Sequence, residues 1–283
     1  MKPLVTLVTP VFNAMPYFGE YLDCVLRQTW RPLELIAVDD GSTDGSWEHL
    51  AERLPDFAQA GILIRPLRIL HGGQAAAVNA ALPLVSGEYL TWCDADDWLM
   101  PDSIEKKADF LTGSPELGMV RSDGIVLDGD TGQVLSHSAT AEDRRTQNIF
   151  DALFRGTTYC YAGCYMVRTA LLFACYPDRQ IPLSPEGQNL QLLLPPASRS
   201  DCGFLPDVLH TYCRRSGGHS SKKLSFRQAC ARLENFSALR RAILPRCLCD
   251  AEYYLEEDRK LTGAARQALC RAAAAQARKE TRN

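Results

Sequence analysis

Residues 88–97 read Glu88-Tyr89-Leu90-Thr91-Trp92-Cys93-Asp94-Ala95-Asp96-Asp97, an apolar run that ends in three carboxylates. The run is short and rich in aromatic and β-branched residues, which predicts a buried strand. Carboxylates clustered at a strand end repel one another unless a cation or a hydrogen-bond donor offsets them. A hard divalent cation with oxygen ligands suits this position. The alternative is a solvated acidic turn that caps the helix after Pro101.

The surrounding chain alternates between short apolar runs and helical spacing. Strands are predicted at 4–9, 33–38, 62–70 and 88–93, and helices at 15–28, 46–53 and 74–84. This alternation predicts βαβ units and a mostly parallel sheet in an α/β fold. Such a sheet binds ligands beyond the carboxyl ends of its strands. The polar clusters fall at these ends: Phe12-Asn13, Asp39-Asp40, residues 71–74 and residues 94–97.

Two of these clusters have chemistry of their own. In Asp39-Asp40-Gly41-Ser42-Thr43-Asp44, a carboxylate can accept hydrogen bonds from a base or a ribose, while Ser42 or Asp44 can cap the next helix. In His71-Gly72-Gly73-Gln74, two glycines at a helix start allow close approach of the backbone to a phosphate. The sequence contains neither a P-loop nor GxGxxG, which argues against an NTPase and a dinucleotide enzyme.

Composition limits the class of protein. The 283 residues are 46% hydrophobic and carry a formal charge of −3, which fits a soluble domain and argues against a nucleic-acid partner. The eleven cysteines are scattered without a CxxC pair, which favours reduced thiols and a cytoplasmic protein. No signal peptide is evident, and the uncharged segment 69–87 is too polar for a membrane span.

The chain changes character twice along its length. The alternation loosens after Thr112, and helical spacing dominates from Ser225 to the end. We therefore expect a main domain over 1–224 with two halves, 1–112 and 113–224. A C-terminal helical extension would occupy 225–283.

The order and spacing of four segments together are specific. Thr6–Asn13, Ala37–Asp44, Ala75–Asn79 and Asp94–Trp98 resemble the family 2 inverting glycosyltransferases of the bacterial surface-polysaccharide type. The match covers roughly the first 110 residues, which implies that 1–112 is the nucleotide-sugar-binding half of the domain and 113–224 the acceptor half. It implies a GT-A fold, a Rossmann-like nucleotide-binding domain, and a UDP-sugar donor, with dTDP-sugars also open.

The resemblance also implies residue roles. Phe12 would lie against the donor base, Asp40 would read its imide edge, and Asp39 would sit beside it. Gly73 and Asn79 would line the diphosphate, Asp94 would approach the ribose, and Asp96 would hold Mn²⁺ or Mg²⁺. The predicted donor-binding residues are Pro10, Phe12, Asn13, Asp39, Asp40, Gly73, Asn79 and Asp94. His219, in a stretch (212–221) that resembles the family's closing loop, would complete the metal site or contact phosphate.

The chain departs from the family where the catalytic base is expected. The family places a Glu-Asp pair at a helix start, whereas this chain has Gln188-Asn189. An amide does not take up a proton at neutral pH, so Glu186 is the predicted base and Asp97 the alternative.

These observations predict a metal-dependent glycosyltransferase that inverts the anomeric centre, with a glycan or lipid-linked acceptor. Peripheral contact with the inner face of a membrane would involve the C-terminal helices. One alternative is a catalytically silent sugar-nucleotide binder. Another is a nucleotidyltransferase, which the lack of Lys and Arg in residues 10–16 disfavours.

Overall fold

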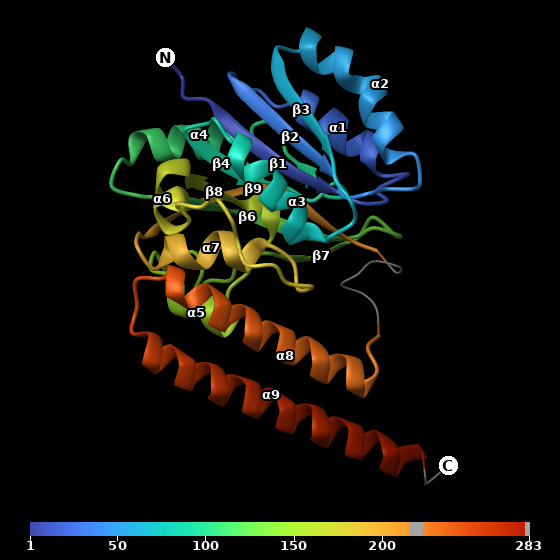
Figure 1. The fold of residues 1–283 in the computed structure, drawn as a ribbon, viewed down its shortest axis with the longest axis vertical. Coiled ribbons are helices and arrows are strands. Elements are labelled where there is room, and N and C mark those ends of the chain that lie inside the picture. Colours follow the sequence, from blue (N-terminus) through green and yellow to red (C-terminus); the bar gives the residue numbers. More distant parts are fainter. Residues whose placement is uncertain (216–222, 281–283) are drawn as a thin grey trace.

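A computed structural model describes residues 1–215 and 223–280 of the chain. Its centre is a nine-stranded sheet in the order β3-β2-β1-β4-β8-β6-β9-β5, with β7 paired to β6 (Figure 1). Helices cover both faces of this sheet, and two long helices follow at the C-terminus. The α/β class predicted from the sequence is confirmed.

The first half of the sheet is parallel, as predicted. It comprises β1 (Val5–Val11), β2 (Leu33–Asp39), β3 (Ile62–Arg68) and β4 (Tyr89–Trp92), with β1 between β2 and β4. Every residue of β1 and β2 is buried, which explains why both strands read as continuous apolar runs rather than as alternating patterns. Because β1 and β2 run parallel, their carboxyl ends lie together at one edge of the sheet.

The second half of the sheet mixes directions. It contains β5 (Trp98–Leu99), β6 (Met119–Asp128), β7 (Val134–His137), β8 (Tyr165–Arg168) and β9 (Cys202–Arg214). Strand β8 runs antiparallel to both β4 and β6, whereas β9 runs parallel to β6 and antiparallel to β5. The parallel arrangement predicted for the sheet thus ends at β4. Strand β9 brings the segment before residue 216 next to the carboxylates after β4.

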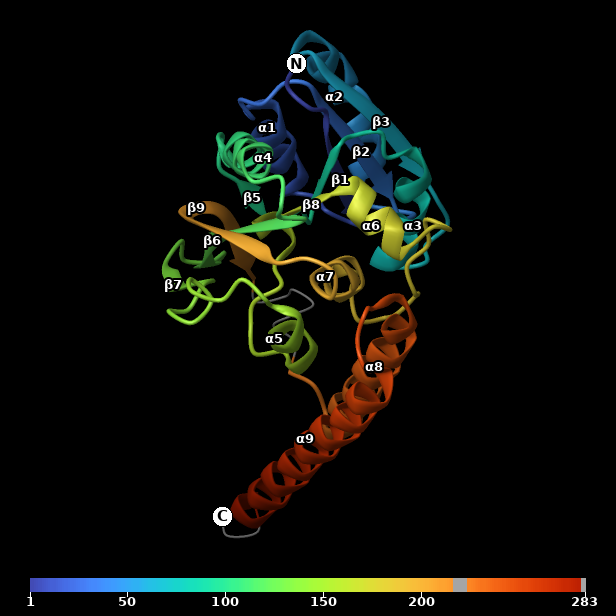
Figure 2. The same ribbon diagram turned by 90° about the vertical axis from the view of Figure 1, so that its left-hand side faces the viewer.

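Two hydrophobic cores lie on opposite faces of the sheet (Figure 2). One is covered by α1 (Phe18–Leu26), α2 (Ser46–Gln59) and α4 (Ser103–Gly113). The other is covered by α3 (Gln74–Ala81), α5 (Phe150–Arg155), α6 (Thr169–Cys175) and α7 (Asn189–Ala197). Short 3₁₀ turns occupy Leu82–Leu84, Ala162–Cys164 and Leu244–Arg246.

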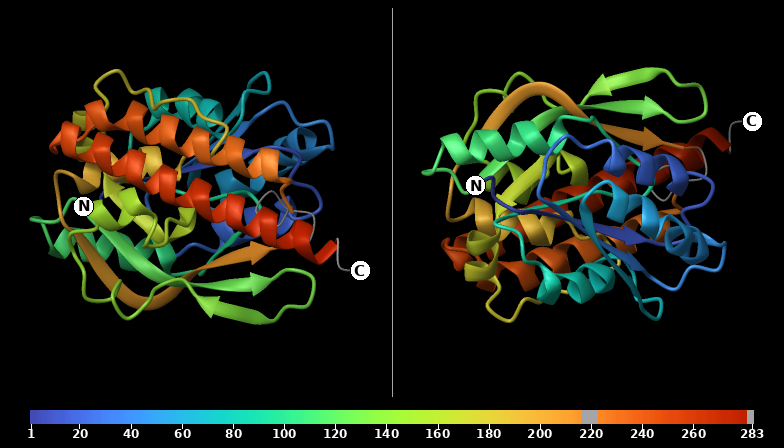
Figure 3. Two further views of the ribbon diagram at one scale, coloured as in Figure 1. Left: turned by 90° about the horizontal axis from the view of Figure 1, so that it is seen from below. Right: turned by 90° about the horizontal axis from the view of Figure 1, so that it is seen from above.

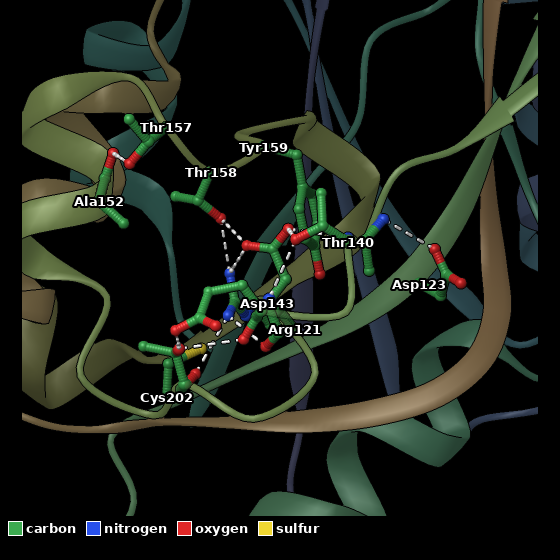
Figure 4. Close-up of polar contacts among 12 residues, drawn as sticks. Arg121, Asp123, Thr140, Asp143, Ala152, Thr157, Thr158, Tyr159 and Cys202 are labelled. Atoms are coloured by element: carbon green, nitrogen blue, oxygen red, sulfur yellow. Dashed lines mark hydrogen bonds and ion pairs between the residues drawn. The ribbon is translucent and has the colours of Figure 1, made fainter.

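A buried ion pair attaches the segment between β7 and α5 to strand β6 (Figure 4). Arg121 is fully buried; its Nη1 donates to Asp143 (3.2 Å) and Thr158 (2.8 Å), and its Nη2 donates to the Asp143 carbonyl (2.6 Å). A charge placed in the interior is tolerated only with such partners. The pair therefore fixes the segment between β7 and α5 on the sheet.

Helices are present at the C-terminus, as predicted, and two of them form a hairpin, which the sequence did not indicate. Helices α8 (Phe226–Ile243) and α9 (Ala251–Glu280) lie side by side and project from the sheet (Figures 2 and 3). The buried Asp258 joins them, since its carboxylate accepts from Ser237 (2.6 Å), Arg240 (2.7 Å) and Arg241 (2.9 Å). Among the described residues, no helix is long and apolar enough to cross a membrane.

Candidate functional site

The predicted polar clusters meet at the carboxyl edge of β1, β2 and β4. The ends of β1 and β2 stay paired to their last residues, and the Asp40 N–H donates to the Val11 carbonyl at 2.7 Å. The loops that follow are joined as well. The Asn13 side-chain oxygen accepts from the Thr43 N–H at 2.9 Å, and the Asn13 N–H donates to Ser42 Oγ at 2.9 Å. Pro10 lies buried within β1, opposite Val38.

Asp40 holds the glycine loop that precedes α3. Its buried carboxylate accepts hydrogen bonds from the N–H groups of Gly72 and Gly73, both at 2.8 Å, and contacts His71 Nδ1 at 2.8 Å. Both carboxylate oxygens are thus engaged within the protein. The resemblance implies that Asp40 reads the imide edge of the base, which stays a prediction; in the structure its carboxylate holds the glycine loop before α3.

His71 brings a second aromatic ring to the predicted base site. Its imidazole stacks on Phe12, with ring centroids 4.1 Å apart and an interplanar angle of 18°. Phe12 is 46% exposed and the His71 side chain 57%, so the pair forms part of the surface at this edge. The sequence placed His71 in a motif but did not assign it this contact.

The remaining predicted donor residues differ in what they face. Asp39 is fully buried, where it accepts from the Ser42 N–H (3.2 Å) and pairs with Arg68 (3.1 Å). Gly73 precedes the first turn of α3 with φ of 87°, a left-handed conformation that glycine adopts readily. Asn79 exchanges two hydrogen bonds with the backbone of Ile181 (3.0 and 2.8 Å), so it anchors the segment before α7.

Three carboxylates after β4 have distinct environments. Burial, with Asp97 and Asp96 close by, raises the pKa of Asp94 to about 7, although the Gln188 amide donates to it at 3.1 Å. Burial and Asp96 also raise the pKa of Asp97, whose carboxylate accepts from the Cys213 N–H (3.0 Å) and contacts His210 Nε2 (3.2 Å). Only Asp96 is well exposed, with half of its side chain open to solvent.

Asp96 is paired with an arginine. Arg215 Nη1 lies 3.1 Å from its carboxylate, and the same guanidinium lies over the Tyr17 ring at 3.7 Å from the centroid. The sequence prediction expected an Arg or His of the 212–221 stretch near the metal or diphosphate, and named His219. His219 lies outside the described residues, whereas Arg215 occupies the position beside Asp96.

The arrangement fits a cation that shares its ligands with a substrate. Burial, followed by repulsion from neighbouring carboxylates, raises the pKa of Asp94 and of Asp97, and a divalent ion bound nearby would favour the charged form of both. No group of three or more His, Cys, Asp or Glu side chains is arranged as a complete metal site within residues 1–215 and 223–280. A hard cation at Asp96 would therefore take most of its oxygen ligands from phosphates and water.

The segment before α7 lies against the same carboxylates. The Gln188 amide donates to Asp94, and Asn189 Oδ1 accepts from Trp92 Nε1 at 2.7 Å. Glu186 faces the other way: its carboxylate accepts from Arg232 Nε (3.0 Å) and Asn235 Nδ2 (3.2 Å) on α8. Both predicted base candidates, Glu186 and Asp97, therefore have partners within the protein. No sequence pattern indicated the contacts with α8.

Comparison with known proteins was consistent with this geometry. A family model described as Glycosyl transferase family 2 matches residues 6–173, more than half of the chain. Glycosyltransferase GlyG of Streptococcus pneumoniae is 35% identical over 231 residues, which cover 77% of this chain and 73% of GlyG. An uncharacterized glycosyltransferase of Haemophilus influenzae is 34% identical over 109 residues, 38% of this chain and 42% of that protein. For three of the glycosyltransferases that it matches, the chain spans only 14% to 42% of their length.

Solved structures share the fold. S. aureus TarS 1–349 in complex with UDP-GlcNAc superposes with a TM-score of 0.66 at 19% identity, over 92% of this chain and 72% of TarS. A mannosyltransferase from Pyrobaculum calidifontis, in complex with GDP-Man and Mn²⁺, gives a TM-score of 0.58 at 20% identity, over 97% of this chain and 76% of its own. At these identities the likeness establishes the fold of the chain.

Proposed function

The chain belongs to glycosyltransferase family 2, and from this premise we propose that it moves a sugar from a nucleotide-diphosphate donor, favouring a UDP-sugar, to a glycan or lipid-linked acceptor. The transfer is a single displacement that inverts the anomeric carbon. Residues 1–224 carry out the transfer, with residues 1–112 holding the donor and 113–224 facing the acceptor.

One observation carries the proposal: the stacked Phe12–His71 pair, the glycine loop shaped by Asp40 and the exposed Asp96 all meet at one sheet edge. An aromatic surface suits a base, and free N–H groups at a helix start suit a diphosphate. An exposed carboxylate next to them suits the cation that accompanies a diphosphate.

The residues around Asp96 would support the departure of the nucleotide. Mn²⁺ or Mg²⁺, when bound there, would neutralise the charge that develops on the diphosphate. Asp96 would hold the ion from the protein side. Arg215, which is already beside Asp96, can turn toward the diphosphate from the same place.

A second candidate is a sugar-nucleotide binder without transfer activity. Gln188-Asn189 replaces the expected acidic pair, and the two nearest base candidates are engaged by Arg232 and His210. Turnover of a donor would exclude it.

Nucleotide binding provides the first test. We expect UDP or a UDP-sugar to raise the melting temperature in the presence of Mn²⁺, and Asp96→Ala to remove most of that shift. GDP and GDP-mannose serve as the comparison, and Asp109→Asn, at an exposed position on α4, as the control variant. If neither nucleotide series shifts the wild-type melting temperature at saturation, the donor site does not exist as proposed.

A further inference from the structure

Segment 181–189, between α6 and α7, is attached to three different parts of the fold. At its start, Ile181 is held by Asn79 of α3 through two hydrogen bonds. At its end, Gln188 and Asn189 contact Asp94 and Trp92, the residues at the end of β4. Between them, Glu186 is bonded to Arg232 and Asn235 of α8. The segment thus connects the phosphate side of the edge, its carboxylates and the C-terminal hairpin.

The contact between Glu186 and α8 is well formed. The Glu186 side chain is 7% exposed, and each of its two carboxylate oxygens has its own donor from α8. Arg232 and Asn235 are three residues apart, so both project from the same face of the helix. A buried carboxylate held by a guanidinium and an amide has a fixed position, because leaving it would cost both partners their hydrogen bonds.

The backbone after Glu186 links the position of its carboxylate to that of Gln188. Gly187 has φ of 71°, a left-handed conformation that turns the chain sharply between Glu186 and Gln188. The Gly187 carbonyl accepts from Gln191 Nε2 at 2.8 Å, which fixes the turn to the first turn of α7. Only this short, braced turn separates the carboxylate held by α8 from the amide that contacts Asp94.

We propose that Glu186 is a positioning residue: by fixing segment 181–189 to α8, it sets the place of the Gln188 amide on Asp94. The C-terminal hairpin thereby contributes to the geometry of the donor edge without touching it. The expected effect on kcat rests on the proposed function, whereas the attachment of segment 181–189 to α8 does not depend on it.

The charge-neutral variant separates positioning from proton transfer. Glu186→Gln keeps the shape of the side chain and an oxygen that accepts from Arg232. For a positioning residue we expect at most about a five-fold loss in kcat, whereas loss of a general base costs about 10²–10⁴-fold. Glu186→Ala removes the contact and should reduce kcat by about 10–100-fold, with KM for the donor changed less than three-fold, since misplacement by about 1 Å has effects of that size.

Exchanging the charges of Glu186 and Arg232 provides a second test of their contact. Arg232→Glu should reproduce the defect of Glu186→Ala, and Glu186→Arg combined with Arg232→Glu should recover at least part of the lost rate. Glu234→Gln is the matched control: it removes an exposed ion pair with Arg266 (3.0 Å) from the same helix, and should leave kcat unchanged.

Hydrogen exchange measured by mass spectrometry tests the inference without any activity. Peptides that cover residues 181–190 should exchange faster in Glu186→Ala and Arg232→Glu than in the wild type, and return toward wild-type rates in the swapped pair. Unchanged exchange in this segment, or a loss of activity in Glu186→Gln as deep as in Glu186→Ala, would overturn the assignment. If the wild type has no turnover but the exchange pattern is as expected, the proposed function fails and the attachment stands.

Discussion

Asp40→Asn tests whether Asp40 shapes the phosphate loop or reads the base. The carboxylate accepts from two backbone N–H groups and from His71, all at 2.8 Å in a buried setting. An Asn side chain has one acceptor oxygen, so its NH₂ group must face one of these three donors, and at least one partly buried donor loses its partner. Each unsatisfied buried group costs about 1–3 kcal/mol, and the lost bonds were made to a charged acceptor. We expect a total loss of about 2–4 kcal/mol in the free energy of unfolding.

The assay is denaturant unfolding monitored by circular dichroism, with Asp109→Asn on α4 as the control for loss of one surface carboxylate. The melting temperature should fall by about 2 °C or more for each kcal/mol lost. UDP binding should weaken as a consequence of the altered loop. A variant as stable as wild type that has nonetheless lost UDP binding would refute this account, and would return Asp40 to the direct contact with the base that the family resemblance implies.

Three further expectations follow from named contacts. Against the effect of burial, hydrogen bonds from Ser237, Arg241 and Arg240 hold the pKa of the Asp258 carboxyl below its usual range. The charged carboxylate therefore stabilises the fold above about pH 4, and this contribution is lost as pH falls through the lower folded-state pKa. Acid unfolding curves of wild type and Asp258→Asn should differ at neutral pH and converge in acid. Arg215→Met should raise the affinity for Mn²⁺ in the absence of nucleotide by about two- to five-fold, the scale of an exposed ion pair, as measured by the EPR signal of free Mn²⁺. Asp143→Ala leaves the buried Arg121 guanidinium without its carboxylate, and should lower the free energy of unfolding in denaturant by about 3–5 kcal/mol. A loss below about 1 kcal/mol would show that the Thr158 hydroxyl and backbone carbonyls are sufficient partners for Arg121.

The half of the fold that we propose to hold the donor (1–112) was predictable because its signals are local. Buried parallel strands read as apolar runs, and the polar residues that follow β1, β2 and β4 mark the functional edge by position alone. Helix bounds were less accurate: α2 continues past Pro55 to Gln59, because tertiary packing of Phe57 in the core outweighs the usual helix-ending effect of proline.

The second half of the domain (113–224) was not predictable because its contacts join residues far apart in the chain. Strands β6 and β9 contain Arg121, Asp123 and His210, charged or polar residues whose burial depends on partners from other segments. The partner of Glu186 lies 46 residues away on α8, and nothing in the residues around Glu186 indicates it. Glu186 was predicted to be a base from its position in the sequence, which stays a prediction; the structure adds its hydrogen bonds to α8.

Donor turnover tests the central claim most directly. Purified protein is incubated with UDP-GlcNAc and Mn²⁺, and the release of UDP is followed with and without EDTA, in wild type and Asp96→Ala, with GDP-mannose as the alternative donor. The account predicts metal-dependent release of nucleotide diphosphate by the wild type, reduced at least about 100-fold in Asp96→Ala, since the variant loses the group that holds the cation against the leaving diphosphate. Release that is equally fast in Asp96→Ala, or none from either donor despite tight nucleotide binding, would contradict it; the second result would identify the chain as a sugar-nucleotide binder.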